Sequence, residues 1–359
     1  ANDFAKFICS TLLNAPSNNL KYLSVENANV TNDGIEHFVD LVKSQNCHLK
    51  AGKLKLDFQN CTAKVMREFI EINHPCLPQD IKLSVTSLEE AELIASSVKI
   101  NDYIKTITIN EYKLPLQMLR TEKKVVLKNE NGIKLCKFDF ALVVVLLTSN
   151  KNVKTVDLRN TYEVAEADEL EQKDKVEITE FLCNLLMNKK KETNFDLKLE
   201  WNHLDIECIL SFFKTKHDCL PTALDISTSN PESNMEQFDE FSNLLINNKK
   251  LKYLKLYDVY INLQAFGRAA KINFSEKRAG PIMLIADLKN NLKFDKTLGA
   301  KLKSLDIVMI SKKLQTNDKV QEFRLTDAML GSEALETFTE IIYKKRKLNF
   351  VRMEACNIT

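Results

Sequence analysis

The chain has 359 residues, of which 44% are hydrophobic, and its formal net charge is only +2. So small a charge gives no bias toward nucleic acid or acidic lipid, and neither is expected as a partner. No run of about 18 apolar residues occurs, so no integral membrane association is predicted.

The nine cysteines are odd in number and have no tight framework spacing, which indicates reduced thiols in a cytoplasmic protein. The first predicted element is a helix over residues 4–13, whose apolar residues share one face. Residues 1–19 are therefore expected to form an N-terminal cap or a truncated repeat. From residue 20 onward, alternating apolar pairs followed by helical patterns predict strands at Leu23/Val25, Leu54/Leu56, Ile81/Leu83 and Ile107/Ile109.

The pattern is irregular over 115–150, where 125–127 and 133–135 each fit a strand, and 141–147 fits a helix or a strand. It returns at Val156/Leu158. An acidic insertion follows at 161–177, with seven acids against two lysines. This insertion fits either a solvated loop or the extended start of a helix.

Regular strands are predicted again at Leu197/Leu199, Leu224/Ile226 and Leu254/Leu256. Residues 262–300 are irregular, with Ile282, Leu284 and Ala286 as the predicted strand. Three more strands follow, at Leu305/Ile307, Phe323/Leu325 and Val351/Met353. No helix comes after the last of them, which predicts an array truncated at its C-terminal end, because an open end needs a polar cap.

The stretch 195–214 shows the repeating unit most clearly. Leu197 and Leu199 alternate, Asn202 and Leu204 follow, and 206–213 has helical spacing. This L-x-L-x-x-N-x-L pattern, repeated roughly every 28 residues, resembles the ribonuclease-inhibitor-like subclass of leucine-rich-repeat proteins. The Asn is strict only at Asn202, and the same position elsewhere holds Ala28, Gln59, Val259, Ala328 and Cys356.

The resemblance implies an α/β leucine-rich-repeat solenoid, a curved horseshoe with parallel strands on the concave face and helices on the convex face. About 11 to 13 units are expected to occupy residues 20–359. In its Lys- and Asn-rich style the array also resembles the leucine-rich-repeat effectors that intracellular bacterial pathogens secrete. That resemblance implies secretion into the host cell cytoplasm.

No glycine-rich phosphate loop and no hydrolase or metalloprotease motif occurs in the sequence. We therefore expect no enzymatic activity, no cofactor and no small-molecule substrate. The best metal-like set fits no standard zinc spacing, and core and loop roles are expected for its members, which are Cys47, His48, Cys61, His74 and Cys76. A second set, His217, Asp218 and Cys219 with His203 nearby, is expected to pack in a loop rather than to supply a nucleophile.

Basic runs close several predicted helices, at 189–191, 249–250 and 344–347. Cations at these ends complement the helix dipole, which is the expected role. The alternative is a basic edge formed by stacked repeats that contacts acidic lipid or nucleic acid.

The residues that flank each strand pair should point into the concave hollow, and they carry mixed charges, which suits a protein partner. Trp201 is the lone tryptophan and is predicted to anchor the interface. The alternative is that it packs on a neighbouring turn. The predicted partner-binding residues are Trp201, Tyr253, Tyr257, Tyr260, Arg159, Asp157, Lys198, Glu200, Lys255, Arg324 and Arg352.

The expected function is a non-catalytic scaffold that binds a protein on its concave face, either a host protein or another effector. One alternative is a regulator of a small GTPase, which a resemblance to the Ran GTPase-activating protein implies. That role requires a positioned arginine, for which Arg159, Arg324 and Arg352 are candidates. The other alternative is the substrate-recognition part of a larger enzyme.

Overall fold

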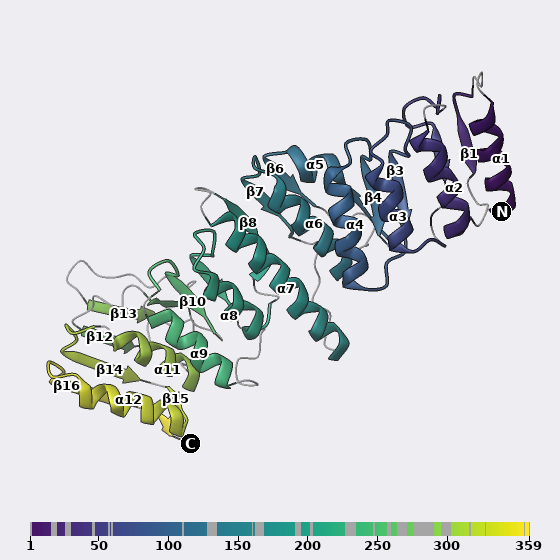
Figure 1. Cartoon of the computed structure of the whole chain (residues 1–359). Helices are drawn as coiled ribbons and strands as arrows, with labels where there is room; N and C mark the ends of the chain where they lie inside the picture. Colours follow the sequence, from purple (N-terminus) through teal and green to yellow (C-terminus); the bar gives the residue numbers. More distant parts are fainter. Residues whose placement is uncertain are drawn as a thin grey trace. The chain divides into compact units, whose positions relative to one another are not determined.

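The fold is known from a computed structural model, which divides the chain into two compact units, Ala1–Leu199 and Glu200–Thr359 (Figure 1). Both units consist of short strands and helices. The structure describes residues 2–15, 20–25, 30–44, 47–56, 58, 60–109, 111–127, 135–159, 161, 169–190, 195–201, 204–226, 235–246, 248–256, 260–263, 271–275, 291–295, 303–315, 317–326, 328–354 and 356–358.

Successive helices of the first unit pack against one another, apart from the short α5, which packs on α6. They are α1 (Asn2–Asn14), α2 (Asn32–Lys43), α3 (Ala63–Glu71), α4 (Leu88–Ile100), α5 (Leu116–Thr121), α6 (Lys137–Ser149) and α7 (Glu169–Lys189). The strands are β1 (Leu23–Val25), β2 (Leu54–Leu56), β3 (Asp80–Leu83), β4 (Thr106–Ile109), β5 (Tyr112–Pro115), β6 (Lys124–Val126), β7 (Thr155–Asp157) and β8 (Asp196–Lys198).

These strands form three short sheets, β1-β2, β3-β4-β5 and β6-β7-β8, which are parallel except for the β4–β5 hairpin. The register places apolar residues opposite one another, as in Leu23–Leu54 and Val156–Leu197, and all four are buried. Alternation with period two sends these side chains to the helix-covered face and their neighbours to the other face. The strands predicted in this unit at Leu23/Val25, Leu54/Leu56, Ile81/Leu83 and Ile107/Ile109 are confirmed, and those at Val156/Leu158 and Leu197/Leu199 end one residue earlier than predicted.

The structure decides some of the alternatives left open by the sequence; residues 133–134 of the second possible strand lie outside the described residues. Residues 141–147 belong to helix α6, and Val125 lies in strand β6. The described part of the acidic insertion, 169–177, is the first half of helix α7. Within this helix, Asp174 and Glu177 both face Lys137 of α6, at 2.9 and 3.2 Å from its Nζ.

The helices that the structure describes in the second unit are α8 (Ile206–Thr215), α9 (Met235–Ile246), α11 (Ser304–Leu314) and α12 (Ser332–Lys344). Its strands are β9 (Ala223–Asp225), β10 (Tyr253–Lys255), β11 (Tyr260–Asn262), β12 (Lys271–Ser275), β13 (Asn291–Asp295), β14 (Glu322–Thr326), β15 (Met329–Leu330), β16 (Phe350–Glu354) and β17 (Asn357–Ile358). Three sheets result, in the orders β11-β10-β9, β13-β12-β14-β16 and β15-β17.

One strand prediction in this unit is wrong, because Leu305 and Ile307 lie in helix α11. Two apolar residues separated by one position also fit a buried helix face, and the pair alone does not distinguish the two. The helix begins where the buried Asp306 carboxylate accepts the Lys303 backbone N–H at 2.9 Å. The strand predicted at Ile282, Leu284 and Ala286 lies outside the described residues.

A polar side chain closes the turn from helix to strand in several repeats. Asn150 Oδ1 accepts the backbone N–H groups of Asn152 and Val153, at 2.8 and 3.2 Å. Asn101 and Asn248 accept the equivalent pairs, and Asn317 accepts the N–H of Lys319. Each asparagine satisfies amides that the strand ladder does not reach.

The same turns are tied to the preceding repeat. Asn101 Nδ2 donates to the Ile70 carbonyl, and Asn150 Nδ2 donates to the Leu119 and Glu122 carbonyls. Buried or half-buried cations do the same elsewhere: Arg120 binds the Val98 and Ile104 carbonyls, Lys189 the Asn150 carbonyl and Lys345 the Gln315 carbonyl. These contacts join consecutive turns into a polar ladder. The carbonyls that Lys189 and Lys345 bind lie at the C-terminal ends of the preceding helices, α6 and α11.

Both units are therefore mixed α/β arrays with repeated, mostly parallel strands, consistent with an α/β solenoid. In the part of the chain that the structure describes, no helix is both long and apolar enough to cross a bilayer.

Candidate functional site

Among the strand side chains of the second unit that the structure describes, the most exposed aromatic lies on strand β16. Phe350 lies opposite Glu322 of β14, is 40% exposed, and has the Arg324 guanidinium 4.8 Å from its ring centroid. Arg324 Nε also donates to Glu322 Oε1 at 2.6 Å. Arg352 lies opposite Arg324 and is exposed. The carboxylate and the ring thus hold Arg324 in place beside a partly exposed aromatic.

The second group of predicted residues lies on the neighbouring sheet of this unit. Lys255 of β10 forms an ion pair with Asp225 of β9 at 3.0 Å, and Tyr253 is half-buried. Tyr260 occupies the position opposite Lys255 in strand β11. Tyr257 lies outside the described residues.

The predicted residues of the first unit form a third group. Arg159 donates two hydrogen bonds to the Asp157 carboxylate, at 2.9 and 2.6 Å. These bonds hold the pKa of Asp157 below its ordinary value. Lys198 Nζ lies 3.9 Å from Asp196 on its own strand. Arg159 and Arg324 therefore both engage a carboxylate two residues before them.

Trp201 packs edge-on against Phe212 of helix α8, with 5.0 Å between ring centroids, and is half-buried. This contact lies within its own repeat, so it differs from the packing on a neighbouring turn that the sequence offered as the alternative. Glu200 precedes it and is also half-buried. The partner-binding residues predicted from the sequence thus fall into separate groups on the two units.

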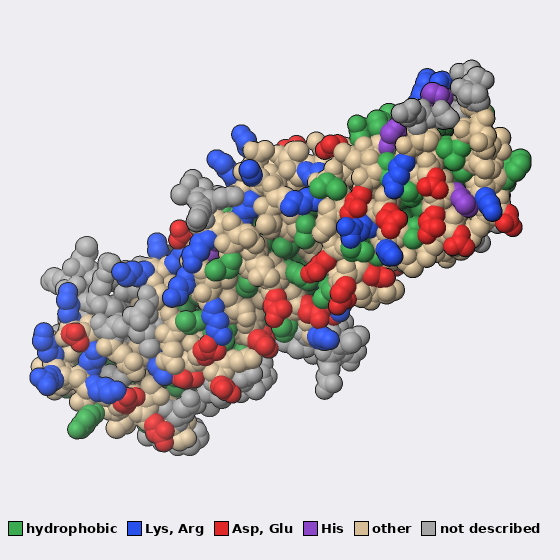
Figure 2. Space-filling view, in the orientation of Figure 1, with side chains coloured by type: hydrophobic (Ala, Val, Ile, Leu, Met, Phe, Trp, Pro, Cys, Tyr) green, Lys and Arg blue, Asp and Glu red, His purple; other side chains and the backbone are tan. Residues whose placement is uncertain are grey.

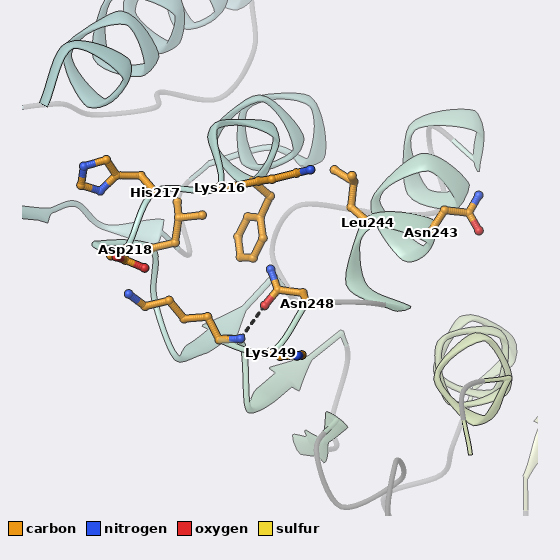
Figure 3. A pocket seen from close by; sticks show the side chains of 10 residues that line it. Lys216, His217, Asp218, Asn243, Leu244, Asn248 and Lys249 are labelled. Atoms are coloured by element: carbon orange, nitrogen blue, oxygen red, sulfur yellow. Dashed lines mark hydrogen bonds between the residues drawn. The ribbon is translucent and has the colours of Figure 1, made fainter. Parts of the chain in front are cut away.

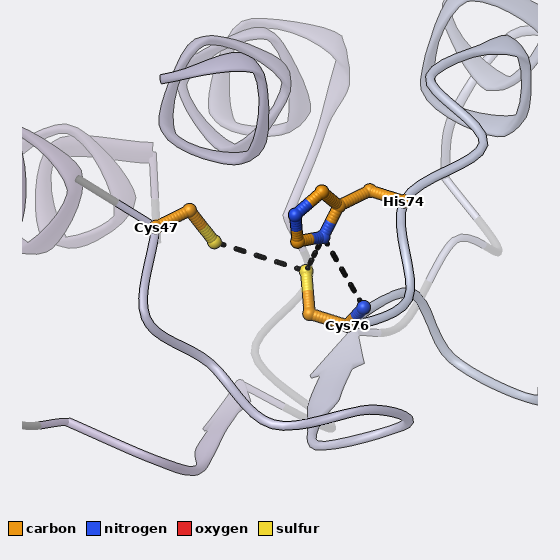
Figure 4. Close-up of side chains that lie close together, drawn as sticks. All are labelled: Cys47, His74 and Cys76. Atoms are coloured by element: carbon orange, nitrogen blue, oxygen red, sulfur yellow. Dashed lines mark hydrogen bonds between the residues drawn. The ribbon is translucent and has the colours of Figure 1, made fainter. Parts of the chain in front are cut away.

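A thiol and imidazole cluster lies between the turns that follow helices α2 and α3 (Figure 4). The Sγ atoms of Cys47 and Cys76 are 3.9 Å apart, and His74 Nδ1 lies 3.0 Å from Cys76 Sγ. Of the five residues in the metal-like set, these three come together. His48 is exposed, and the Cys61 thiol instead points at the Val30 carbonyl at 3.6 Å.

The titration of the cluster is shifted by its own contacts. A hydrogen bond from the Cys76 thiol lowers the pKa of Cys47 to about 6 from its ordinary value. The same contact, together with burial, raises the pKa of Cys76. Desolvation lowers the pKa of His74, so its imidazole is held neutral.

The turn that carries His74 recurs in the second unit, as His-x-Cys-Leu-Pro at 74–78 and at 217–221. In both copies the His Nδ1 accepts the backbone N–H of the Cys two residues later, at 3.2 and 3.0 Å. In both, the residue before the His has a left-handed φ, 51° at Asn73 and 53° at Lys216.

These histidines fill the position that asparagine fills in the other turns, since each accepts the N–H of the residue two later. His217 contacts the Cys219 amide, as its expected loop role requires. A signal for these turns is present in the sequence. In them an Asn or His stands three residues before the first apolar residue of the strand segment, as Asn101 does before Ile104 and Asn150 before Val153. The leucine-rich-repeat pattern L-x-L-x-x-N-x-L instead places its asparagine after the strand, as at Asn202.

A cavity of about 460 Å³ lies beside the second His-x-Cys turn (Figure 3). Phe213 and Leu220 give it an apolar wall, and Lys216 and Lys249, both exposed, lie at its rim. Asn248 also lines it, and Asn248 accepts the Lys250 N–H drawn in the figure at 2.8 Å.

No family model and no curated protein matches this chain. Among solved structures, one similar chain comes from the crystal structure of a Rad7 and Elc1 complex in yeast. It is 11% identical, with 98% of this chain and 75% of that chain covered, at a TM-score of 0.20. So low a score supports neither a shared fold nor a shared function.

Proposed function

We propose that this chain is a non-catalytic, leucine-rich-repeat-type scaffold that binds a protein through the outward side chains of its strands. The supporting observation is the Phe350–Arg324 pair with the exposed Arg352 beside it. Aromatic and arginine side chains dominate protein interfaces. A ring already held by a guanidinium loses little freedom when a partner covers it.

The charge distribution favours a protein partner over a polyanion. Positive and negative residues are mixed along the strands, as at Asp196 and Lys198 of β8 and at Glu322 and Arg324 of β14. The view in Figure 2 also shows both signs on each unit. A uniform polyanion is bound by segregated positive charge. We further propose that the array belongs to the ribonuclease-inhibitor-like subclass and curves as a horseshoe. In this proposal the protein is a secreted effector and its partner is a host protein.

The test starts with affinity capture from a cell lysate, after which each captured protein is purified and its Kd measured against three variants. Phe350→Ala removes the proposed anchor, and Arg352→Ala removes the neighbouring cation. Tyr343→Ala is the matched control, because Tyr343 is a 90% exposed aromatic on helix α12.

A partner of the strand face should bind Phe350→Ala about thirty-fold more weakly, which corresponds to about 2 kcal/mol at an interface hot spot. Tyr343→Ala should bind as the wild type does. A purified partner whose Kd is the same for wild type, Phe350→Ala and Arg352→Ala would remove the support for this surface. Trp201→Ala is a poorer probe, because that ring also packs on Phe212.

A further inference from the structure

We propose that Cys47, His74 and Cys76 form a Zn²⁺ site that joins the turns after helices α2 and α3. Their ligand atoms all lie within 4.8 Å of one another, and among the described residues this is the group of three His, Cys, Asp or Glu that meets this condition. Two thiolates and an imidazole are the donors that zinc prefers.

The distance between the two sulfur atoms matches tetrahedral coordination, and the imidazole lies near enough to complete the set after a shift of its ring. Two Zn–S bonds of about 2.3 Å at the tetrahedral angle place their sulfur atoms about 3.8 Å apart. Cys47 and Cys76 Sγ are 3.9 Å apart. His74 Nδ1, at 3.0 Å from Cys76 Sγ, needs to move by about 0.5 Å to reach the S–N edge of the same tetrahedron.

The backbone holds the two turns together without the metal. The Gly52 N–H donates to the Pro75 carbonyl at 2.9 Å, and the Leu54 N–H donates to the Cys76 carbonyl at 3.0 Å. The chain that carries Cys47 into strand β2 is therefore fixed against the His-x-Cys turn. Pre-arranged ligands lose little freedom when the ion binds.

The surroundings suit three protein ligands and one water. Cys76 is fully buried, whereas Cys47 and His74 are half-buried, so solvent can reach the site. Each thiol that ligates zinc gives its proton to the solvent, and two thiolates then neutralise the divalent ion. Binding through Nδ1 replaces the hydrogen bond that His74 accepts from the Cys76 amide.

The second His-x-Cys turn supplies matched controls. His217 and Cys219 reproduce the turn, including the Nδ1 contact, outside any cluster of three ligands among the described residues. Asparagine fills the same turn position at Asn101 and Asn150. His74→Asn is therefore expected to keep the turn and remove the imidazole, with His217→Asn as its control.

The experiment uses the full chain, reduced and stripped of metal by a chelator, and titrated with Co²⁺ and then Zn²⁺. We expect one equivalent of Co²⁺ to give a thiolate-to-cobalt charge-transfer band, which Zn²⁺ abolishes by displacement. We expect one equivalent of Zn²⁺ to raise the Tm of the wild type.

Cys47→Ser and His74→Asn should each abolish the cobalt band or raise the Kd for Zn²⁺ at least ten-fold. Cys219→Ser and His217→Asn should keep both the cobalt band and the rise in Tm with Zn²⁺. Far-UV circular dichroism checks that each variant is folded. A reduced wild type without the band overturns the proposal, and so does a folded Cys47→Ser chain that keeps it. Conversion of Cys47 and Cys76 to a disulfide by air, with no metal bound after reduction, also overturns it.

Discussion

Replacing Asn150 by alanine should destabilise the first unit more than any exposed substitution near it. Asn150 is 2% exposed, and its side chain makes four hydrogen bonds. Its Nδ2 donates to the Leu119 and Glu122 carbonyls, and its Oδ1 accepts the N–H groups of Asn152 and Val153. Alanine removes both the donor and the acceptor.

The magnitude follows from which of these groups is buried. The contacts to Leu119 and Val153 are buried, and the other two are partly exposed. A buried polar group left without its partner costs about 1–3 kcal/mol, whereas water replaces the partner of an exposed one. We therefore expect Asn150→Ala to lower the free energy of unfolding by roughly 2–6 kcal/mol.

Asn150→Asp tests the donor separately, because it keeps an acceptor and places a carboxylate against two carbonyls. It should be at least as destabilising as alanine. Asn152→Ala, at an exposed position of the same turn, is the control and should change stability by less than about 0.5 kcal/mol.

The assay combines urea unfolding with hydrogen exchange at the Asn152 and Val153 amides, because a chain of two units need not unfold in one step. The reasoning is refuted if Asn150→Ala costs less than about 1 kcal/mol more than Asn152→Ala, or if Asn150→Asp is as stable as the wild type.

Three further substitutions test other parts of the fold. Burial raises the pKa of Asp139 to about 7 from 3.8, so the folded state holds a proton that the unfolded state has lost, and stability should fall as pH rises from about 4 to about 7. Asp139→Asn should flatten that slope, with a gain of up to about 4 kcal/mol above pH 7 in urea titrations; an unchanged slope would assign it to other groups. Gly34→Ala should lower the free energy of unfolding by about 1–3 kcal/mol, because a Cβ there would lie 2.8 Å from Asn2 Oδ1 and closer still to Val30. A Tm equal to that of the wild type would show that α1 can shift freely. Lys216→Gly should raise the free energy of unfolding by up to about 1 kcal/mol, because Lys216 has a φ of 53° at the end of α8 and glycine adopts this left-handed conformation without strain. A lower Tm would show that contacts of the Lys216 side chain stabilise the fold by more than the backbone strain costs.

The candidate sites were only partly predictable. The positions of Arg324 and Arg352 beside buried strand residues identify them from the sequence. Phe350, whose ring contacts the Arg324 guanidinium, becomes a candidate anchor only once its exposure is known. Cys47, His74 and Cys76 belong to a larger set whose spacing fits no standard zinc module, so the sequence predicts core and loop roles for them. Sequence separation does not tell which side chains of neighbouring turns meet, because that depends on how the backbone of one turn lies against the next.

The sequence by itself determined the repeating strand and helix units, because alternation with period two followed by period 3.6 leaves one face for the core. It also determined most strand positions, through pairs such as Leu23/Val25 and Phe323/Leu325. Only the tertiary structure decided that Leu305 and Ile307 are helical, that β12 lies between β13 and β14, and that Asn or His closes the turns. Each of these depends on contacts between repeats, where buried amides and carbonyls must find partners that a local pattern does not name.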